Sequence, residues 1–96
     1  MPENSTTPTV PRLDIDGVDI PVHVAQHVLS HFGDEGLGVQ PGSFITLLMR
    51  AAQHADRSNR ARLLSAYPAY VQALHSARQS PFLLQRLREF VQEATR

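Results

Sequence analysis

The sequence predicts a mainly α protein, a compact bundle of four to five short helices with a small N-terminal β-hairpin. Apolar residues recur at helical spacing along most of the chain, and Pro, Ser and Asp stand at positions typical of helix starts. One Asp-Gly pair near the N-terminus favours a tight hairpin. A length of 96 residues suits one modest core, so we expect residues 12–96 to form a single helical domain. Residues 1–11, with three Pro among Ser and Thr, are expected to be a disordered tail.

The segment Arg12–Pro21 carries the hairpin signal. Asp16-Gly17 favours a two-residue type I′ turn. With that turn the apolar residues share one face, Leu13 opposite Ile20 and Ile15 opposite Val18. Asp14 and Asp19 meet on the other face, where their like charges repel. Because strands this short are marginal alone, we expect the ribbon to lie against the helices.

Five helices are predicted after the hairpin. Pro21 suits the first turn of the helix 22–32, and a loop with three Gly occupies residues 33–41. Ser43, Asp56, Pro68 and the Ser80-Pro81 pair then indicate four further helix starts. In chain order the expected inner residues are Val24, Ala25, Val28, Leu29 and Phe32; Phe44, Leu47, Leu48, Ala51, Ala52 and Ala55; Leu63, Leu64 and Tyr67; Tyr70, Val71 and Leu74; and Leu83, Leu87, Phe90, Val91 and Ala94.

The composition excludes several kinds of chemistry. The chain has no Cys, which rules out disulfides, thiol catalysis and Cys-based zinc sites and fits a reducing compartment. No apolar stretch approaches the roughly 18–20 residues of a membrane span. The start of the chain is polar and acidic, without the basic-then-apolar order of a signal peptide. We therefore expect a cytoplasmic protein with no membrane partner.

No catalytic or cofactor motif is recognisable. The Gly-rich segment 36–43 lacks the Gly-Lys that a phosphate-binding loop places before its Ser. The three Asp around Gly17 do not follow the spacing of a calcium-binding EF-hand loop. Ser43, Ser58 and Ser80 stand where helix caps should stand, which accounts for them. We expect a protein that is not an enzyme and uses no cofactor.

Three histidines lie along one side of the first helix. His23, His27 and His31 are spaced i, i+4, i+8, which places their imidazoles beside the apolar stripe and pointing mostly outward. Two His at this spacing can chelate zinc, but no second group of ligands at metal spacing is visible, so no metal site is predicted. A His-rich exposed flank is the main interpretation. A metal-binding or pH-responsive helix is the less favoured alternative.

Charge is unevenly distributed although its sum is zero. Residues 1–35 contain six acidic residues and one Arg (net −5), and residues 36–88 contain seven Arg and one Asp (net +6). Arg50, Arg57, Arg60 and Arg62 are candidates for phosphate contacts in a nucleic-acid-binding module. Against this, a nucleic-acid-binding domain is usually strongly basic. The alternative is a solvated surface that pairs with the acidic N-terminal third or with Glu89 and Glu93.

One segment resembles a known group of proteins. It consists of Gly-Val-Gln-Pro-Gly-Ser-Phe at 38–44 followed by Leu47, Leu48, Ala51, Ala55-Asp56 and Asn59. This pattern resembles small uncharacterised helical proteins from actinobacterial-type phages and prophages, and the similarity extends over roughly residues 13–75. The resemblance implies a small accessory protein and no known activity. The region from Ser80 departs from that group, which has a Trp-containing tail there.

The leading hypothesis is a non-enzymatic accessory or regulatory protein that binds another protein, with a homodimer as one form of that binding. Aromatic residues at helix corners and the fourth helix supply the candidate contact residues, which are Tyr67, Tyr70, Leu74 and Phe82. Tyr70 and Phe82 would mark a binding patch if both are exposed together. Nucleic-acid binding through the Arg-rich half is the alternative.

Overall fold

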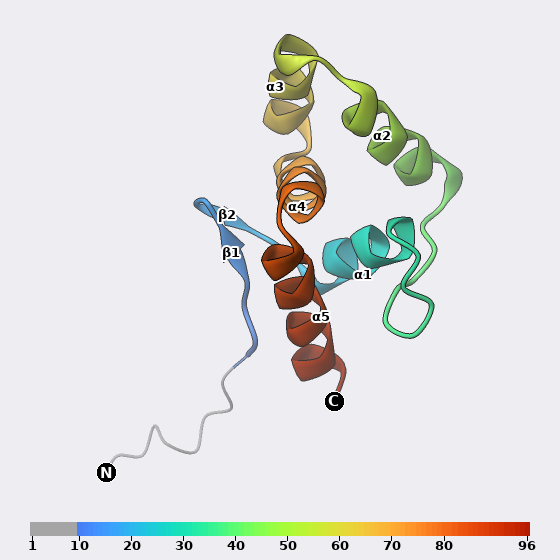
Figure 1. Ribbon diagram of the computed structural model, residues 1–96, viewed down its shortest axis with the longest axis vertical. Coiled ribbons are helices and arrows are strands. Elements are labelled where there is room, and N and C mark those ends of the chain that lie inside the picture. The colour runs from blue at the N-terminus through green and yellow to red at the C-terminus, as the bar shows by residue number, and fades with distance from the viewer. Residues whose placement is uncertain (1–9) are drawn as a thin grey trace.

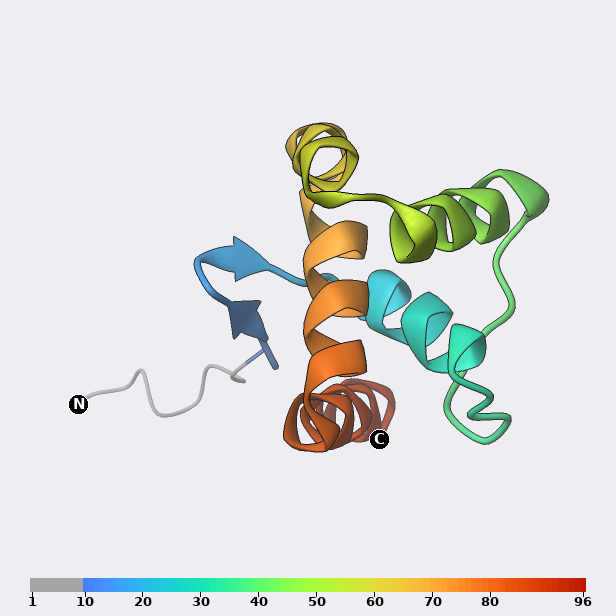
Figure 2. The ribbon, with the colours of Figure 1, turned by 45° about the horizontal axis from the view of Figure 1, so that its top comes forward.

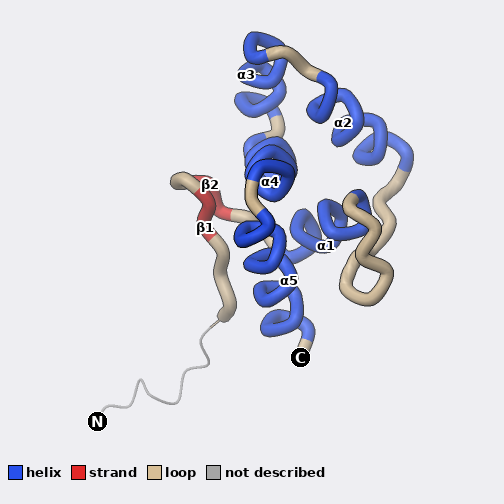
Figure 3. The backbone as a smooth tube through the Cα atoms, viewed as in Figure 1, coloured by secondary structure: helices blue, strands red, loops and turns tan. Residues whose placement is uncertain are grey.

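The structure, a computed structural model, describes residues 10–96, so only the last two residues of the predicted tail are seen. A two-stranded hairpin is followed by five helices (Figures 1 and 3). The elements are β1 (Asp14–Ile15), β2 (Val18–Asp19), α1 (Val22–His31), α2 (Ser43–His54), α3 (Arg57–Ala66), α4 (Pro68–Gln79) and α5 (Pro81–Thr95). The prediction of a mainly α fold with a small N-terminal hairpin is confirmed.

The helix α4 is the centre of the arrangement. It packs against the other four helices and against both strands. Figure 2 shows α1 and α2 on one side of α4, the hairpin on the other side, and α3 and α5 at its two ends. The helices α1 and α5 also pack against each other, whereas α2 does not contact α5.

The hydrophobic core is built around this central helix. Its buried members are Leu13, Ile15, Ile20, Val24, Ala25, Val28, Leu29, Met49, Ala52, Val71, Ala73, Leu74, Ala77, Leu87, Phe90 and Val91. They come from the hairpin and from four of the helices. The exception is α3, which buries no residue and touches the core only through the half-buried Leu63 and Leu64.

The hairpin has the predicted turn and register. Asp16 and Gly17 both have positive φ, 51° and 84°, as a type I′ turn requires. Ile15 pairs with Val18, and Asp14 pairs with Asp19. The Asp14 carboxylate accepts a hydrogen bond of 2.9 Å from the Gly17 amide, which ties one of the two facing Asp to the turn. The ribbon lies on α4 as expected, because its apolar face completes the core.

Asp34 organises the loop between α1 and α2. The helix α1 ends in a Schellman motif, in which Gly33 has φ 87° and the Asp34 amide donates to Leu29 O at 3.0 Å. The Asp34 carboxylate, 14% exposed, accepts from the Leu37 amide at 2.9 Å and pairs with Arg88 Nε of α5 at 2.9 Å. The Leu37 amide is the main cause that lowers the pKa of Asp34, and Arg88 lowers it further against the effect of burial. The loop is therefore fastened to both α1 and α5.

The start of α2 differs from the prediction. Gly42 is the N-cap residue, with φ −68° and ψ 174°, and Ser43 is the first residue of the helix rather than its cap. No side chain of the cap residue bonds the helix end. The amide and the hydroxyl of Thr46 both donate to Gly42 O at 3.0 Å, so the cap residue's carbonyl is bonded while its missing side chain leaves the first helix amides uncapped.

The face of α2 that packs inward also differs from the predicted one. Its buried residues are Leu48, Met49 and Ala52. Phe44, Leu47 and Ala51, which were predicted to pack inside, are exposed. Four of the five residues at 44–48 are apolar, so two stripes overlap on this helix and periodicity alone does not choose between them. In the fold the stripe that includes Met49 is buried, and the other faces outward.

Candidate functional site

The four residues predicted to bind a partner do not form one surface. Leu74 is 2% exposed and belongs to the core, so its assignment to a binding surface is wrong. Tyr70 is half-buried against α1, where its hydroxyl shares a hydrogen bond of 2.7 Å with His27 Nδ1. Tyr67 and Phe82 are exposed, at opposite ends of α4. Because Tyr70 is packed inside, the condition for a Tyr70–Phe82 patch is not met.

An exposed apolar surface lies instead on α2. Phe44 is 60% exposed and Leu47, one turn further along, is 61% exposed. The ring of Phe44 lies 5.9 Å from the ring of Tyr67, which stands between α3 and α4. We call Phe44, Leu47 and Tyr67 the α2 outer face. Sequence reasoning missed it because it assigned the first two residues to the core.

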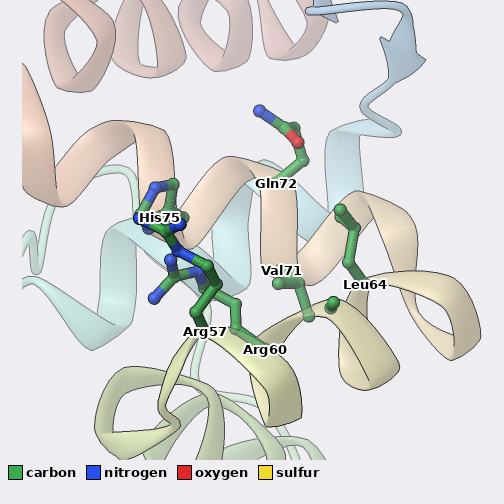
Figure 4. Close-up of a pocket in the computed structure, with 7 residues that line it drawn as sticks. Arg57, Arg60, Leu64, Val71, Gln72 and His75 are labelled. Carbon is green, nitrogen blue, oxygen red and sulfur yellow. The ribbon is translucent and has the colours of Figure 1, made fainter.

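A second candidate site is a cavity of about 220 Å³ between α3 and α4 (Figure 4). Arg57, Arg60 and His75 line one part of it, with their side chains gathered together in the figure. The remainder is mainly apolar, lined by Ala61, Leu64 and Val71. Gln72 stands at its edge, where its amide nitrogen donates to Asp16 Oδ2 at 3.3 Å and to Ser76 Oγ at 3.1 Å. We call this space the α3–α4 cavity.

The arginines of the chain fall into two groups. In residues 10–96 the ion pairs are Arg12–Asp19, Arg86–Glu89, Arg88–Asp34 and Arg96–Glu93. The Arg residues on α2, α3 and α4 form no ion pair with an acid of this part of the chain; they are Arg50, Arg57, Arg60, Arg62 and Arg78. The expectation of a self-paired surface therefore describes the Arg residues of α5 and not those of α3.

The cations of this second group have different neighbours. Arg62 bonds Asn59 Oδ1 at 3.3 Å on the surface of α3, whereas Arg60 faces the α3–α4 cavity. Arg78 donates to the backbone oxygen of Gln53 at 3.0 Å. Burial, Arg60 and Arg78, in that order of importance, lower the pKa of His75. Positive charge is therefore concentrated around His75 without a carboxylate to balance it in the described chain.

The histidines of α1 pack more than predicted. His23 is exposed, but His27 is stacked against Tyr70, with ring centroids 5.9 Å apart, and His31 Nε2 lies 2.7 Å from Gln53 Oε1. Burial, followed by the charge of His23, lowers the pKa of His27. Within residues 10–96 no group of three potential metal ligands is close enough to hold an ion. The three His therefore do not converge on one point.

The two histidines with lowered pKa predict a dependence of stability on pH. Because folding lowers the pKa of His27 and His75 below 6.5, the unfolded chain binds protons first on acidification. Their stabilising contribution is present above pH about 6.5 and is lost as the pH falls through the folded-state pKa values. Thermal unfolding should give a Tm that falls between pH about 7.5 and 5.5. The double variant His27→Gln, His75→Gln should flatten this dependence, and a Tm that rises on acidification would contradict it.

Comparison of the chain with family models, with curated proteins and with solved structures finds no match. In the part of the chain from residue 10 onward, no helix is long and apolar enough to cross a membrane. The surface features that bear on function are the α2 outer face, the α3–α4 cavity and the Arg residues around that cavity that form no ion pair within residues 10–96.

Proposed function

We propose that this protein is a non-enzymatic binding module that acts by packing its α2 outer face against another protein, and that a second copy of the chain is one such partner. The observation that carries the proposal is the exposure of Phe44 and Leu47 on a helix whose opposite side is well buried. Single exposed apolar residues are common on protein surfaces. Here Phe44 and Leu47 share one helix face, and Phe44 contacts the exposed Tyr67. The three side chains therefore form one exposed apolar patch.

The geometry of the face suits self-association. In a two-fold dimer the same patch is used twice, so each aromatic or leucine side chain contributes to both halves of the interface. Tyr is one of the residues enriched among interface hot spots, and aromatic residues including Phe are enriched at interfaces in general. We further propose that the protein works in the cytoplasm as an accessory protein of the phage or prophage type.

The mass of the protein in solution tests this proposal. Light scattering at protein concentrations up to about 1 mM detects a dimer even when the free energy of association is only about −4 kcal/mol. We expect a dimer whose dissociation is little affected by salt, because apolar contacts are not screened. The variant Phe44→Asp should be monomeric, since a charged carboxylate replaces the aromatic anchor.

Phe82→Asp is the matched control. Phe82 is 70% exposed and, like Phe44, is the second residue of its helix. The same substitution therefore has the same local effect on a helix that does not touch α2. Phe82→Asp should remain dimeric. A wild-type protein that stays monomeric throughout the concentration range, or a Phe44→Asp variant that still dimerises, would overturn self-association through this face.

Nucleic-acid binding is the second candidate function. It is favoured by the Arg residues that form no ion pair within residues 10–96. The connection between α2 and α3 is also short, two residues, against the three to four of a helix-turn-helix. The same light-scattering measurement with a short DNA duplex tests it. Arg–phosphate contacts would give binding that weakens with salt, with a slope of about −0.9 per phosphate in a logarithmic plot. No complex at low salt would exclude this candidate.

A further inference from the structure

The α3–α4 cavity is not used by the proposed function, and its lining has a specific chemistry. Val71 is buried and Leu64 half-buried, so the apolar part is continuous with the core. Arg60 and His75, both half-buried, stand beside it together with the exposed Arg57. A half-buried cation is a costly feature unless an anion accompanies it, because burial removes part of its hydration.

No acid of the described chain fills that role. The two carboxylates nearest in sequence or contact are engaged in other bonds: Asp56 accepts from the Asn59 amide at 2.8 Å, and Asp16 accepts from Gln72. Neither forms an ion pair with Arg57 or Arg60 in residues 10–96. Burial is the main cause that lowers the pKa of His75, and the positive charges of Arg60 and Arg78 lower it further. The lining of the cavity is therefore suited to accept an anion.

Size restricts what the ligand can be. A volume of about 220 Å³ is smaller than the roughly 300–1,000 Å³ of pockets that enclose drug-sized molecules. The cationic and apolar parts are also adjacent, because Arg60 precedes Ala61 and Leu64 follows one turn later on the same helix. A ligand that fills the cavity must therefore be small and must carry its anionic group next to an apolar group.

We infer that the α3–α4 cavity binds the C-terminal residue of a peptide, an apolar residue whose carboxylate accepts hydrogen bonds from Arg57 and Arg60. Its side chain lies against Ala61, Leu64 and Val71. A terminal residue has a carboxylate and an apolar side chain on the same carbon atom, and guanidinium groups match carboxylate oxygens in geometry. His75 lines the same cavity, and in either protonation state its ring has an N–H to donate to the carboxylate.

A nucleic-acid backbone fits the cavity less well. Phosphates would satisfy the cations but would leave the apolar part of the lining uncovered. No Phe, Tyr or Trp lines the cavity to stack an unpaired base. The apolar lining therefore favours a peptide over a nucleic acid.

N-acetyl-leucine is the first probe, observed by NMR shifts of His75, Leu64 and Val71. N-acetyl-leucinamide has the same shape without the charge, and N-acetylglycine has the charge without the apolar side chain. We expect each of these two controls to bind at least about 10-fold more weakly than N-acetyl-leucine. Equal binding of N-acetyl-leucinamide, or displacement of N-acetyl-leucine by an equal concentration of inorganic phosphate, would overturn the inference.

Two arginine variants of α3 test whether N-acetyl-leucine binds in the α3–α4 cavity. Arg60→Gln should weaken N-acetyl-leucine binding by about 10-fold or more, because it removes a charged donor at the cavity. Arg62→Gln, the same charge change outside the cavity, should alter it by less than about 2-fold. Equal effects of the two variants would mean general charge attraction and would overturn the assignment.

The effect of ligand length tests whether the natural ligand is a peptide or a small acid. A tetrapeptide ending in Leu with a free carboxylate should bind more tightly than N-acetyl-leucine, whereas equal affinity would indicate a free small acid and overturn the peptide assignment. The variant Phe44→Asp should leave all of these affinities unchanged, because the α2 outer face is not part of the cavity. Failure of the dimer and failure of this site are therefore distinguishable.

Discussion

Replacing Leu74 with Ala should lower the free energy of unfolding by about 2–5 kcal/mol, the largest effect we expect from a single truncation in this protein. Leu74 is 2% exposed in the middle of α4, the helix against which all other elements pack. Its truncation leaves a cavity at the centre of the core that the surrounding helices cannot fill without moving. Against a total stability of about 5–15 kcal/mol, this is a substantial fraction. Urea unfolding followed by circular dichroism measures the change directly.

Leu47→Ala is the matched control for Leu74→Ala. The two residues have the same chemistry and both lie within helices, but Leu47 is exposed. Its truncation should change stability by no more than about 0.5 kcal/mol, with the substitution measured on monomeric protein at low concentration. If the two substitutions have similar effects, the rotational setting of α2 and α4 described above is wrong.

Gly38→Ala should also be strongly destabilising, by about 1–3 kcal/mol or more. A Cβ atom at Gly38 would clash with the Asp34 backbone oxygen and would lie 2.6 Å from the Ser30 backbone nitrogen. Both are backbone atoms, so neither can move aside by a change of rotamer. The Gly38 amide also donates to Asp34 O at 3.0 Å, so displacing this residue disturbs the loop that Asp34 organises.

Gly36→Ala, two residues earlier in the same loop, is the control for Gly38→Ala. A Cβ atom there would meet only the Asp34 carboxylate oxygen, at an ordinary contact distance of 3.7 Å. That substitution should be close to neutral or slightly stabilising, because Ala restricts the unfolded chain more than Gly does. Thermal unfolding of the two variants separates them, and equal Tm values would show that residue 38 does not approach the backbone of α1 closely.

The parts of the fold that depend on local chemistry could be predicted from the sequence. Asp16-Gly17 determines the hairpin turn, because both residues need positive φ and the type I′ geometry then fixes the register. Asp56 accepts a hydrogen bond from the Asn59 amide as an N-cap should, and Ser80 does the same for the Leu83 amide. These interactions span three residues, so the sequence contains all the information they need.

The parts that depend on tertiary packing could not be predicted. Which apolar stripe of α2 is buried depends on how α2 packs against α4. The apolar residues of 44–48 are compatible with either stripe facing the core. Likewise His27 and Tyr70 are 43 residues apart, and no spacing rule brings them together. The α3–α4 cavity has the same origin, because Arg60 and His75 meet only once α3 has packed on α4. Sequence reasoning identified Arg57 and Arg60 by charge but could not supply their apolar neighbours.

The central place of α4 has a consequence for the order of folding during synthesis. The hairpin, α1 and α2 precede α4 in the chain, yet each of them packs against it. A ribosome releases these elements first, and until residues 68–79 emerge their apolar faces have no common partner. Nascent chains arrested before α4 should therefore be sensitive to protease over their whole length, and protection should appear in one step once α4 and α5 have left the exit tunnel.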